Sequence, residues 1–249
     1  MGDHVKALVV AGGEGTRLRP ISYYIQKCMI PLGPKQKPLL EYIIRLLRLH
    51  DVKDIVLSVG YKAEQIVNYF DNGSRFGVDL TYAYDENTYR GSGSALVNAF
   101  RRNVFTENDS LLVYYGDILS NINLSEMLSA HKNKDADITL ALSKGYQIPK
   151  GIAQVKGERI VQLVEKPSLN ILVDMGVVAI EPRVLKTRMK EWTKQHSLDL
   201  MGEILPTAIQ GDLRVFPYVT DAFWYDIGSA EAYEKLDFNA ISPNIKEIQ

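Results

Sequence analysis

The chain has 249 residues, of which 46% are hydrophobic and 24% charged, as is ordinary for a folded globular protein. Its formal net charge of -1 argues against non-specific nucleic-acid binding, which needs a basic surface, and no apolar run approaches the roughly 18 residues of a membrane-spanning helix. The single cysteine, Cys28, excludes an intrachain disulfide and suits a reducing compartment. We therefore expect a cytoplasmic protein without a signal peptide and without nucleic-acid or membrane partners.

The first 142 residues alternate between predicted strands and predicted helices. Short apolar runs rich in β-branched residues predict buried strands, and apolar residues spaced three and four apart predict helices. The predicted strands are Val5–Ala11, Asp54–Val59, Leu80–Tyr84, Ser110–Tyr115 and Asp137–Leu142. The predicted helices are Leu39–His50, Ala63–Phe70, Ser94–Phe105 and Leu124–Asn133. This alternation is typical of a parallel sheet covered by helices on both faces.

The remaining residues are less regular, and no stretch has the composition of a flexible linker. Strands are predicted at Gly151–Lys156, Arg159–Glu165, Met175–Ile180 and Leu213–Val219. Helices are predicted around Pro182–Trp192, at Leu200–Gln210 and at Ala230–Asn239, with an irregular tail after them. We expect residues 1–249 to form a single domain. The four histidines lack metal-ligand spacing, and we expect surface or capping roles for them.

A glycine-rich loop follows the first strand, in the stretch LVVAGGEGTRLRP from Leu8 to Pro20. Glycines allow backbone N–H groups to approach a polyphosphate, and an arginine can clamp phosphate oxygens with two hydrogen bonds. The loop is not a dinucleotide fingerprint, because the third glycine of G-x-G-x-x-G is missing, and it is not a Walker A loop. Taken alone, it could also be a tight turn with solvated arginines.

Several further motifs follow in a fixed order. They are QKCMIPLGPKQKPLLEYI from Gln26, ENTYRGSGSAL from Glu86, YYGDI from Tyr114, LVEKP from Leu163, DMGVVAI from Asp174 and FWYDIG from Phe223. As an ordered set with the glycine loop, they resemble the sugar-1-phosphate nucleotidyltransferases, and the resemblance runs from Lys6 to about Phe238. It implies a Rossmann-like three-layer α/β sandwich with a mostly parallel mixed central sheet, of the nucleotide-diphospho-sugar transferase type.

The resemblance implies a reaction and assigns a role in it to each matching residue. A sugar 1-phosphate would attack the α-phosphorus of a nucleoside triphosphate and release pyrophosphate, with Mg²⁺ as cofactor. Positioning and charge neutralisation dominate such chemistry. The implied catalytic residues are Arg17, Lys27, Asp117 and Asp226, of which the two aspartates would hold the metal ion. The implied nucleotide-binding residues are Ala11, Gly12, Gly13, Gly15, Thr16, Glu86, Gly91 and Ser92. The implied sugar-phosphate-binding residues are Gly151, Glu165, Lys166, Asp174 and Gly176.

Three positions depart from the family pattern. Gln26 replaces the usual proline before the lysine, which we expect to loosen the Lys27 loop, and Tyr89 replaces a proline of the base loop. Asp174 replaces the usual asparagine beside the sugar; its carboxylate can accept hydrogen bonds from sugar hydroxyls but cannot donate to them. No C-terminal β-helix of hexapeptide repeats, common among such proteins, is expected here.

The base and the sugar stay open at this point. A carboxylate at Glu86 could accept hydrogen bonds from N1–H and N2–H₂ of guanine, which favours GTP with mannose or heptose 1-phosphate; alternatively Glu86 faces solvent and backbone groups read the base. Further alternatives are UTP or dTTP with glucose 1-phosphate, CTP with a non-sugar phosphate, a non-catalytic regulatory relative that binds NDP-sugar, and a dehydrogenase-like dinucleotide binder. A homo-oligomer is a further option.

Overall fold

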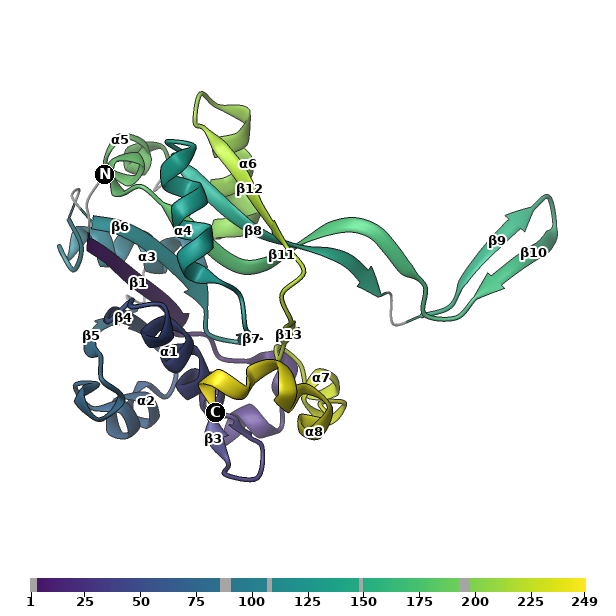
Figure 1. Ribbon diagram of the computed structural model, residues 1–249, viewed down its shortest axis with the longest axis horizontal. Coiled ribbons are helices and arrows are strands. Elements are labelled where there is room, and N and C mark those ends of the chain that lie inside the picture. Colours follow the sequence, from purple (N-terminus) through teal and green to yellow (C-terminus); the bar gives the residue numbers. More distant parts are fainter. Residues whose placement is uncertain (1–3, 86–90, 107–108, 148–149, 193–197) are drawn as a thin grey trace.

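A seven-stranded mixed sheet forms the centre of the molecule, in the strand order β12-β8-β11-β6-β1-β4-β5 (Figure 1). The computed structural model describes residues 4–85, 91–106, 109–147, 150–192 and 198–249. The sheet strands are β1 (His4–Ala11), β4 (Asp54–Val59), β5 (Asp79–Tyr84), β6 (Asp109–Tyr115), β8 (Ile138–Gln147), β11 (Ser168–Ile180) and β12 (Val215–Thr220). Only β11 runs antiparallel to its neighbours, β6 and β8. The predicted mostly parallel mixed sheet is therefore confirmed.

Helices cover both faces of this sheet, because alternate residues of each strand point to opposite sides. In β1, Ala7 and Val9 join one buried cluster and Leu8 joins the other. The first cluster is covered by α1 (Leu39–Leu49), α2 (Ala63–Phe70), α4 (Leu124–Asn133) and the C-terminal residues. The second is covered by α3 (Ser92–Arg101), α5 (Pro182–Trp192) and α6 (Leu205–Gln210). The three-layer sandwich follows from this division.

The structure differs from the sequence-based elements mainly after residue 115. The predicted closing helix is two short helices, α7 (Ala230–Glu234) and α8 (Phe238–Ile241). The tail predicted to be irregular forms a 3₁₀ segment, Ser242–Ile248, which buries Ile245 and Ile248 against α1. A π-helical turn, Leu200–Ile204, precedes α6. Two three-residue strands that sequence reasoning missed, β7 (Ile118–Ser120) and β13 (Trp224–Asp226), pair with each other.

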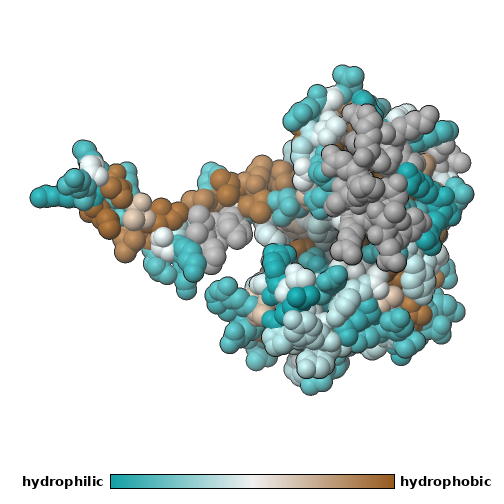
Figure 2. Space-filling model, turned by 180° about the vertical axis from the view of Figure 1, so that it is seen from behind, coloured by the Kyte–Doolittle hydropathy of each residue, from teal (hydrophilic) through white to brown (hydrophobic). Residues whose placement is uncertain are grey.

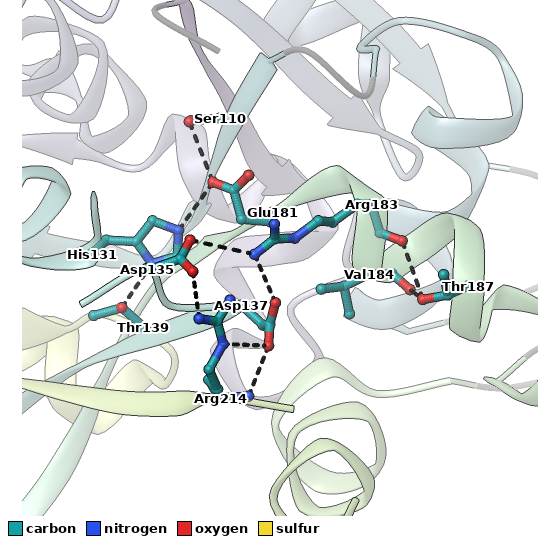
Figure 3. Close-up of polar contacts among 10 residues, drawn as sticks. All are labelled: Ser110, His131, Asp135, Asp137, Thr139, Glu181, Arg183, Val184, Thr187 and Arg214. Carbon is teal, nitrogen blue, oxygen red and sulfur yellow. Dashed lines mark hydrogen bonds and ion pairs between the residues drawn. The ribbon is translucent and has the colours of Figure 1, made fainter. Parts of the chain in front are cut away.

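One predicted surface residue lies in the interior. His131 of α4 is 2% exposed, and its two ring nitrogens face the hydroxyl of Thr139 at 2.8 Å and the carboxylate of Glu181 at 3.3 Å (Figure 3). The expectation of a surface role was wrong because α4 turns this polar side chain onto β8, where polar partners satisfy it. A second, exposed network beside it comprises Asp135, Asp137, Arg183 and Arg214.

A two-stranded ribbon projects from the sheet (Figure 1). It consists of β9 (Ile152–Lys156) and β10 (Arg159–Val164), which pair antiparallel around Gly157. The strands β8 and β11 lead to it and extend well beyond their predicted apolar runs, with pairing that reaches Gln147 and Ser168. We call residues 150–167 the arm.

Candidate functional site

The carboxyl ends of β1, β4, β5 and β6 lie along one edge of the sheet, because these strands are parallel and neighbouring. Each end is followed by a glycine or a carboxylate: Gly12, Gly60, Asp85 and the pair Gly116–Asp117. In open α/β sheets, ligands bind at this edge. The glycine loop and Asp117 are thereby brought to one side of the molecule.

The pairing of β7 with β13 brings the two predicted metal-binding aspartates together. Asp226 lies opposite Ile118 in this ladder, and the N–H of Ile227 donates to the carbonyl of Asp117 at 2.9 Å. Although much of Asp226 remains accessible, partial burial of its carboxyl group and the negative charge of Asp117 raise its pKa. Two carboxylates that repel each other in a partly enclosed site form a donor set that fits a hard divalent cation. The described residues contain no larger cluster of His, Cys, Asp or Glu of metal-binding geometry.

Lys27 lies against this carboxylate pair. Its Nζ is 2.6 Å from Oδ2 of Asp117, and the two side chains are only 18% and 12% exposed. Burial is the largest single influence and acts to lower the pKa of Lys27, but the charge of Asp117 and the hydrogen bond to it, with contributions from Cys28 and Asp226, together outweigh burial, so the pKa lies above its ordinary value. The ammonium group is therefore held protonated beside both aspartates.

Gln26 holds the turn that carries Lys27. Its buried side chain donates from Nε2 to the carbonyl of Ala11 at 2.5 Å and accepts at Oε1 from the N–H of Cys28 at 2.5 Å. Its own N–H donates to the side chain of Gln65 at 2.7 Å. The expectation that this residue loosens the loop was wrong, because an amide can bridge the end of β1 and the lysine turn, which a proline cannot do.

Arg17 approaches the same cluster from the glycine loop. A Cβ at Gly228 would lie 2.7 Å from Oδ1 of Asp226 and 3.0 Å from Nη2 of Arg17, so these groups surround Gly228. Gly15 has φ of 63°, and a Cβ there would lie 3.0 Å from Cβ of Lys27. Glycine therefore suits position 15 both in conformation and in space.

The rest of the loop lies at the mouth of this cluster. Ala11 is buried at the end of β1, whereas Gly13 and Thr16 are exposed. Among the described residues, nothing lies within 4 Å of where a Cβ of Gly13 would be. Gly12 is different, because a Cβ there would lie 1.8 Å from Oδ2 of Asp85. The backbone at Gly13 is thus open to a ligand, while Gly12 packs on a carboxylate.

The predicted base-reading residues are only partly covered by the structure. Glu86 lies outside the described residues, whereas Gly91, with φ of 103°, and Ser92 begin α3. The Ser92 hydroxyl donates to Asp199 at 2.8 Å and accepts from the Tyr115 hydroxyl and the Leu200 N–H, both at 2.9 Å. All three of its hydrogen-bonding positions are used within the protein.

The predicted sugar-phosphate residues fall into two groups. Asp174 and Gly176 lie in β11, where Oδ1 of Asp174 accepts from the N–H of Gly176 at 2.7 Å and Gly176 packs on Tyr115. Gly151, Glu165 and Lys166 lie instead on the arm, which extends away from β7 and β13 (Figure 1). Within one chain, the structure does not bring these three residues to the Asp117–Asp226 pair.

Sequence reasoning missed two residues at the edge of the sheet. Asp85 contacts Gly12 and Gly60 and accepts a hydrogen bond from Ser58 at 2.7 Å; burial raises its pKa. Tyr115 lies between Ser92 and Gly176. Their positions after or at the end of parallel strands are the signal that could have identified them.

Comparison with known proteins identifies the relatives of this chain. Residues 6–241 match the family model described as nucleotidyl transferase. The chain is 30% identical to a UTP–glucose-1-phosphate uridylyltransferase of Synechocystis over 98% of its length, and it spans 66% of that relative. It is 27% identical to a mannose-1-phosphate guanylyltransferase of Mycobacterium tuberculosis over 92% of its length, spanning 62% of it. It is 28% identical to a D-glycero-α-D-manno-heptose 1-phosphate guanylyltransferase of Aneurinibacillus thermoaerophilus over 93% of its length, spanning 96% of it. The chain thus spans less than two thirds of the first two of these relatives.

Solved structures share the fold. One is the structure of a putative glucose-1-phosphate thymidylyltransferase from Bacillus anthracis in complex with sucrose. It superposes with a TM-score of 0.75 and 22% sequence identity, and the match covers 96% of this chain and 95% of the other. Another, HddC from Yersinia pseudotuberculosis complexed with GMP-PN, has a TM-score of 0.70 and 21% identity, covering 93% of this chain and 97% of the other. The predicted fold type is therefore confirmed.

Proposed function

This chain belongs to the nucleotidyl transferase family, and we propose that it transfers a nucleotidyl group from a nucleoside triphosphate to a sugar 1-phosphate, giving NDP-sugar and pyrophosphate. The observation that carries this proposal is the cluster of Lys27, Asp117, Asp226 and Arg17 at the carboxyl edge of the sheet. It joins two cations and two carboxylates, as a reaction among phosphates requires.

The residues have distinct roles in this proposal. Gly13 and Thr16, exposed beside Arg17, would contact the triphosphate, and the guanidinium would neutralise the departing pyrophosphate. Lys27, held protonated by its carboxylate neighbours, would place a positive charge at the α-phosphate. Asp117 and Asp226 would hold one Mg²⁺ together with phosphate oxygens. The bound ion would supply further neutralisation of phosphate charge.

For the substrates, we propose GTP with mannose or heptose 1-phosphate. Relatives named as guanylyltransferases for mannose 1-phosphate and for a heptose 1-phosphate support this choice. The second candidate is UTP with glucose 1-phosphate, favoured by the 30% identity to a uridylyltransferase. We also propose a cytoplasmic location, which suits an enzyme that uses either GTP or UTP.

Within the described residues, no helix has the length and apolar character needed to cross a membrane.

A matrix assay tests the reaction and the substrates together. The protein and Mg²⁺ are incubated with GTP, UTP, dTTP, CTP or ATP against hexose and heptose 1-phosphates, and pyrophosphate release is measured. We expect release with GTP and mannose or heptose 1-phosphate; no release from any pair would contradict the proposal. Asp117→Asn should remove turnover, whereas Asp212→Asn, at an exposed aspartate after α6, should leave it unchanged.

The base preference has a separate test. Glu86→Gln replaces an acceptor-only carboxylate with an amide that also donates, which should shift the preference from GTP toward UTP. The ratio of kcat/KM for the two triphosphates measures the shift. An unchanged ratio would remove Glu86 from base reading.

A further inference from the structure

The arm exposes apolar side chains along both of its strands, up to the charged turn that joins them. Every residue of β9 and β10 is exposed, with Ile160 69% and Leu163 70% accessible. Figure 2 shows apolar residues continuing from the sheet along the shaft of the arm, with hydrophilic residues at its tip. Two strands alone rarely form a stable unit in water, and contiguous exposed apolar surface marks an interaction site. The arm therefore has the character of a segment that packs against something else.

The direction of the arm is set by the sheet. The pairing of β8 with β11 continues to Gln147 and Ser168, so a continuous ribbon carries the arm away from its own body (Figure 1). Glu165 and Lys166, which follow β10, are displaced with it. The cluster around Asp117 is consequently left without these two residues, although Asp174 and Gly176 stay in the body beside Tyr115.

We propose that two copies of this chain exchange arms, so that Glu165 and Lys166 of each copy complete the phosphate cluster of the other. The occupant of the arm's apolar surface is thus a second copy of this chain, in a closed two-fold arrangement. The inference rests on the proposed function, together with the sugar-phosphate roles that the LVEKP motif implies for these two residues. It accounts both for the exposed shaft and for the separation of the two halves of the site.

The body presents a surface suited to receive the arm. Tyr23 and Tyr24, 53% and 76% exposed, follow the Arg17 loop closely in sequence, and the guanidinium of Arg19 lies 5.0 Å from the ring centre of Tyr23. Exposed aromatic side chains are typical anchors of protein interfaces. The charged turn residues Lys156, Glu158 and Arg159 at the far end of the arm can stay in solvent while the shaft is covered.

Sedimentation velocity tests the docking of the arm without reference to activity. The wild type is expected to be dimeric at about 20 µM, and a double variant with Val161→Asp and Leu163→Asp is expected to be monomeric, because charges would have to be buried. Ile209→Asp, at a 61% exposed apolar residue of α6, is the matched control and should stay dimeric. A monomeric wild type, or a double variant that stays dimeric, would overturn the inference.

Heterodimers of two inactive variants test the exchange itself. Copies carrying Asp117→Asn and Lys166→Ala are co-expressed with different tags, and the doubly tagged species is purified. With exchanged arms, one of its two sites is intact, and about half of the wild-type turnover should return. A heterodimer of Asp117→Asn with Asp226→Asn has no intact site in either arrangement and serves as control. If the wild type turns over substrate but the mixed heterodimer does not, each arm serves its own chain and the exchange is refuted. If the wild type itself turns over nothing, the proposed function fails, and the sedimentation result still decides whether the arm docks.

Discussion

The contact between Lys27 and Asp117 makes a quantitative prediction about stability. We consider Lys27→Met, Asp117→Asn and the double variant, which form a double-mutant cycle. Lys27→Met leaves Asp117 and Asp226 beside each other without the ammonium group that contacts Asp117. Asp117→Asn is milder, because Asp226 still contributes a negative charge near the ammonium group.

The expected size follows from the distance and the burial of the pair. At 2.6 Å, two unit charges attract by about 6 kcal/mol if the effective dielectric constant is about 20. Desolvation offsets part of this, and removing one partner costs about 3–5 kcal/mol in buried pairs but about 0.2–1 kcal/mol in exposed ones. Because these side chains are 18% and 12% exposed, we expect Lys27→Met to lower the free energy of unfolding by about 2–4 kcal/mol. The coupling energy should be about 2 kcal/mol.

Urea unfolding at several pH values measures these quantities. The folded-state pKa of Lys27 is raised above its ordinary value of 10.5, so the stabilisation is fully present below pH 10.5 and is lost as the pH rises through the folded-state pKa. The coupling energy should therefore be the same at pH 7 and pH 9. A coupling energy below about 0.5 kcal/mol at pH 7 would refute the reasoning, since it would mean that solvent screens this pair as it does surface pairs.

Three further predictions concern the residues around this pair. Asp226→Asn should abolish turnover but raise the melting temperature at pH 7, because it removes a carboxylate whose charge is disfavoured in the folded state. This gain in melting temperature should shrink as the pH falls through the raised pKa of the wild-type carboxyl, which thermal unfolding in a pH series measures. A variant less stable than the wild type at pH 7 would contradict the prediction. Gln26→Ala should lower the free energy of unfolding by about 1–3 kcal/mol, because two buried hydrogen bonds that position the lysine turn are lost. It should also lower kcat at least tenfold, which corresponds to about 1.4 kcal/mol. An unchanged kcat in steady-state kinetics would exclude this positioning role. Gly12→Ala should lower the free energy of unfolding by about 1 kcal/mol, because the new Cβ displaces the carboxylate of Asp85. Adding Asp85→Gly should recover part of this loss of stability. If the second substitution leaves the loss unchanged, the contact with Asp85 is not its cause.

The regular elements were predictable because their signals are local. The strand Asp54–Val59 and the helices Ala63–Phe70 and Leu124–Asn133 have the predicted bounds. Each is an apolar or amphipathic run of the right period bounded by turns or caps; α4, for example, begins after Asn123, whose side chain accepts from the N–H of Glu126. Neighbouring residues alone carry the information for such elements.

The geometry of the candidate site was less accessible. The strands β7 and β13 have three residues each, too few to show a period, and they pair across about 100 residues of sequence. The motifs named Asp117 and Asp226 as residues of one site, but only this pairing shows how their carboxyl groups come together. The bridging amide of Gln26 was also missed, because its two hydrogen bonds depend on the tertiary position of the Ala11 carbonyl.

The arm shows a second kind of information that a motif does not contain. The residues before and after β9 and β10 matched a sugar-binding pattern, and the pattern is the same whether those residues serve their own chain or another. The two cases differ in how far the pairing of β8 with β11 extends, because this sets the direction of the arm. A β8–β11 ladder that ended near Leu142 would leave a long connection able to fold back on its own body, whereas pairing that reaches Gln147 and Ser168 stiffens the base and directs the arm outward. In the proposed exchange, the extension of β8 by about five residues and of β11 by about seven residues beyond their predicted apolar runs would determine which copy of the chain the proposed sugar-phosphate residues serve.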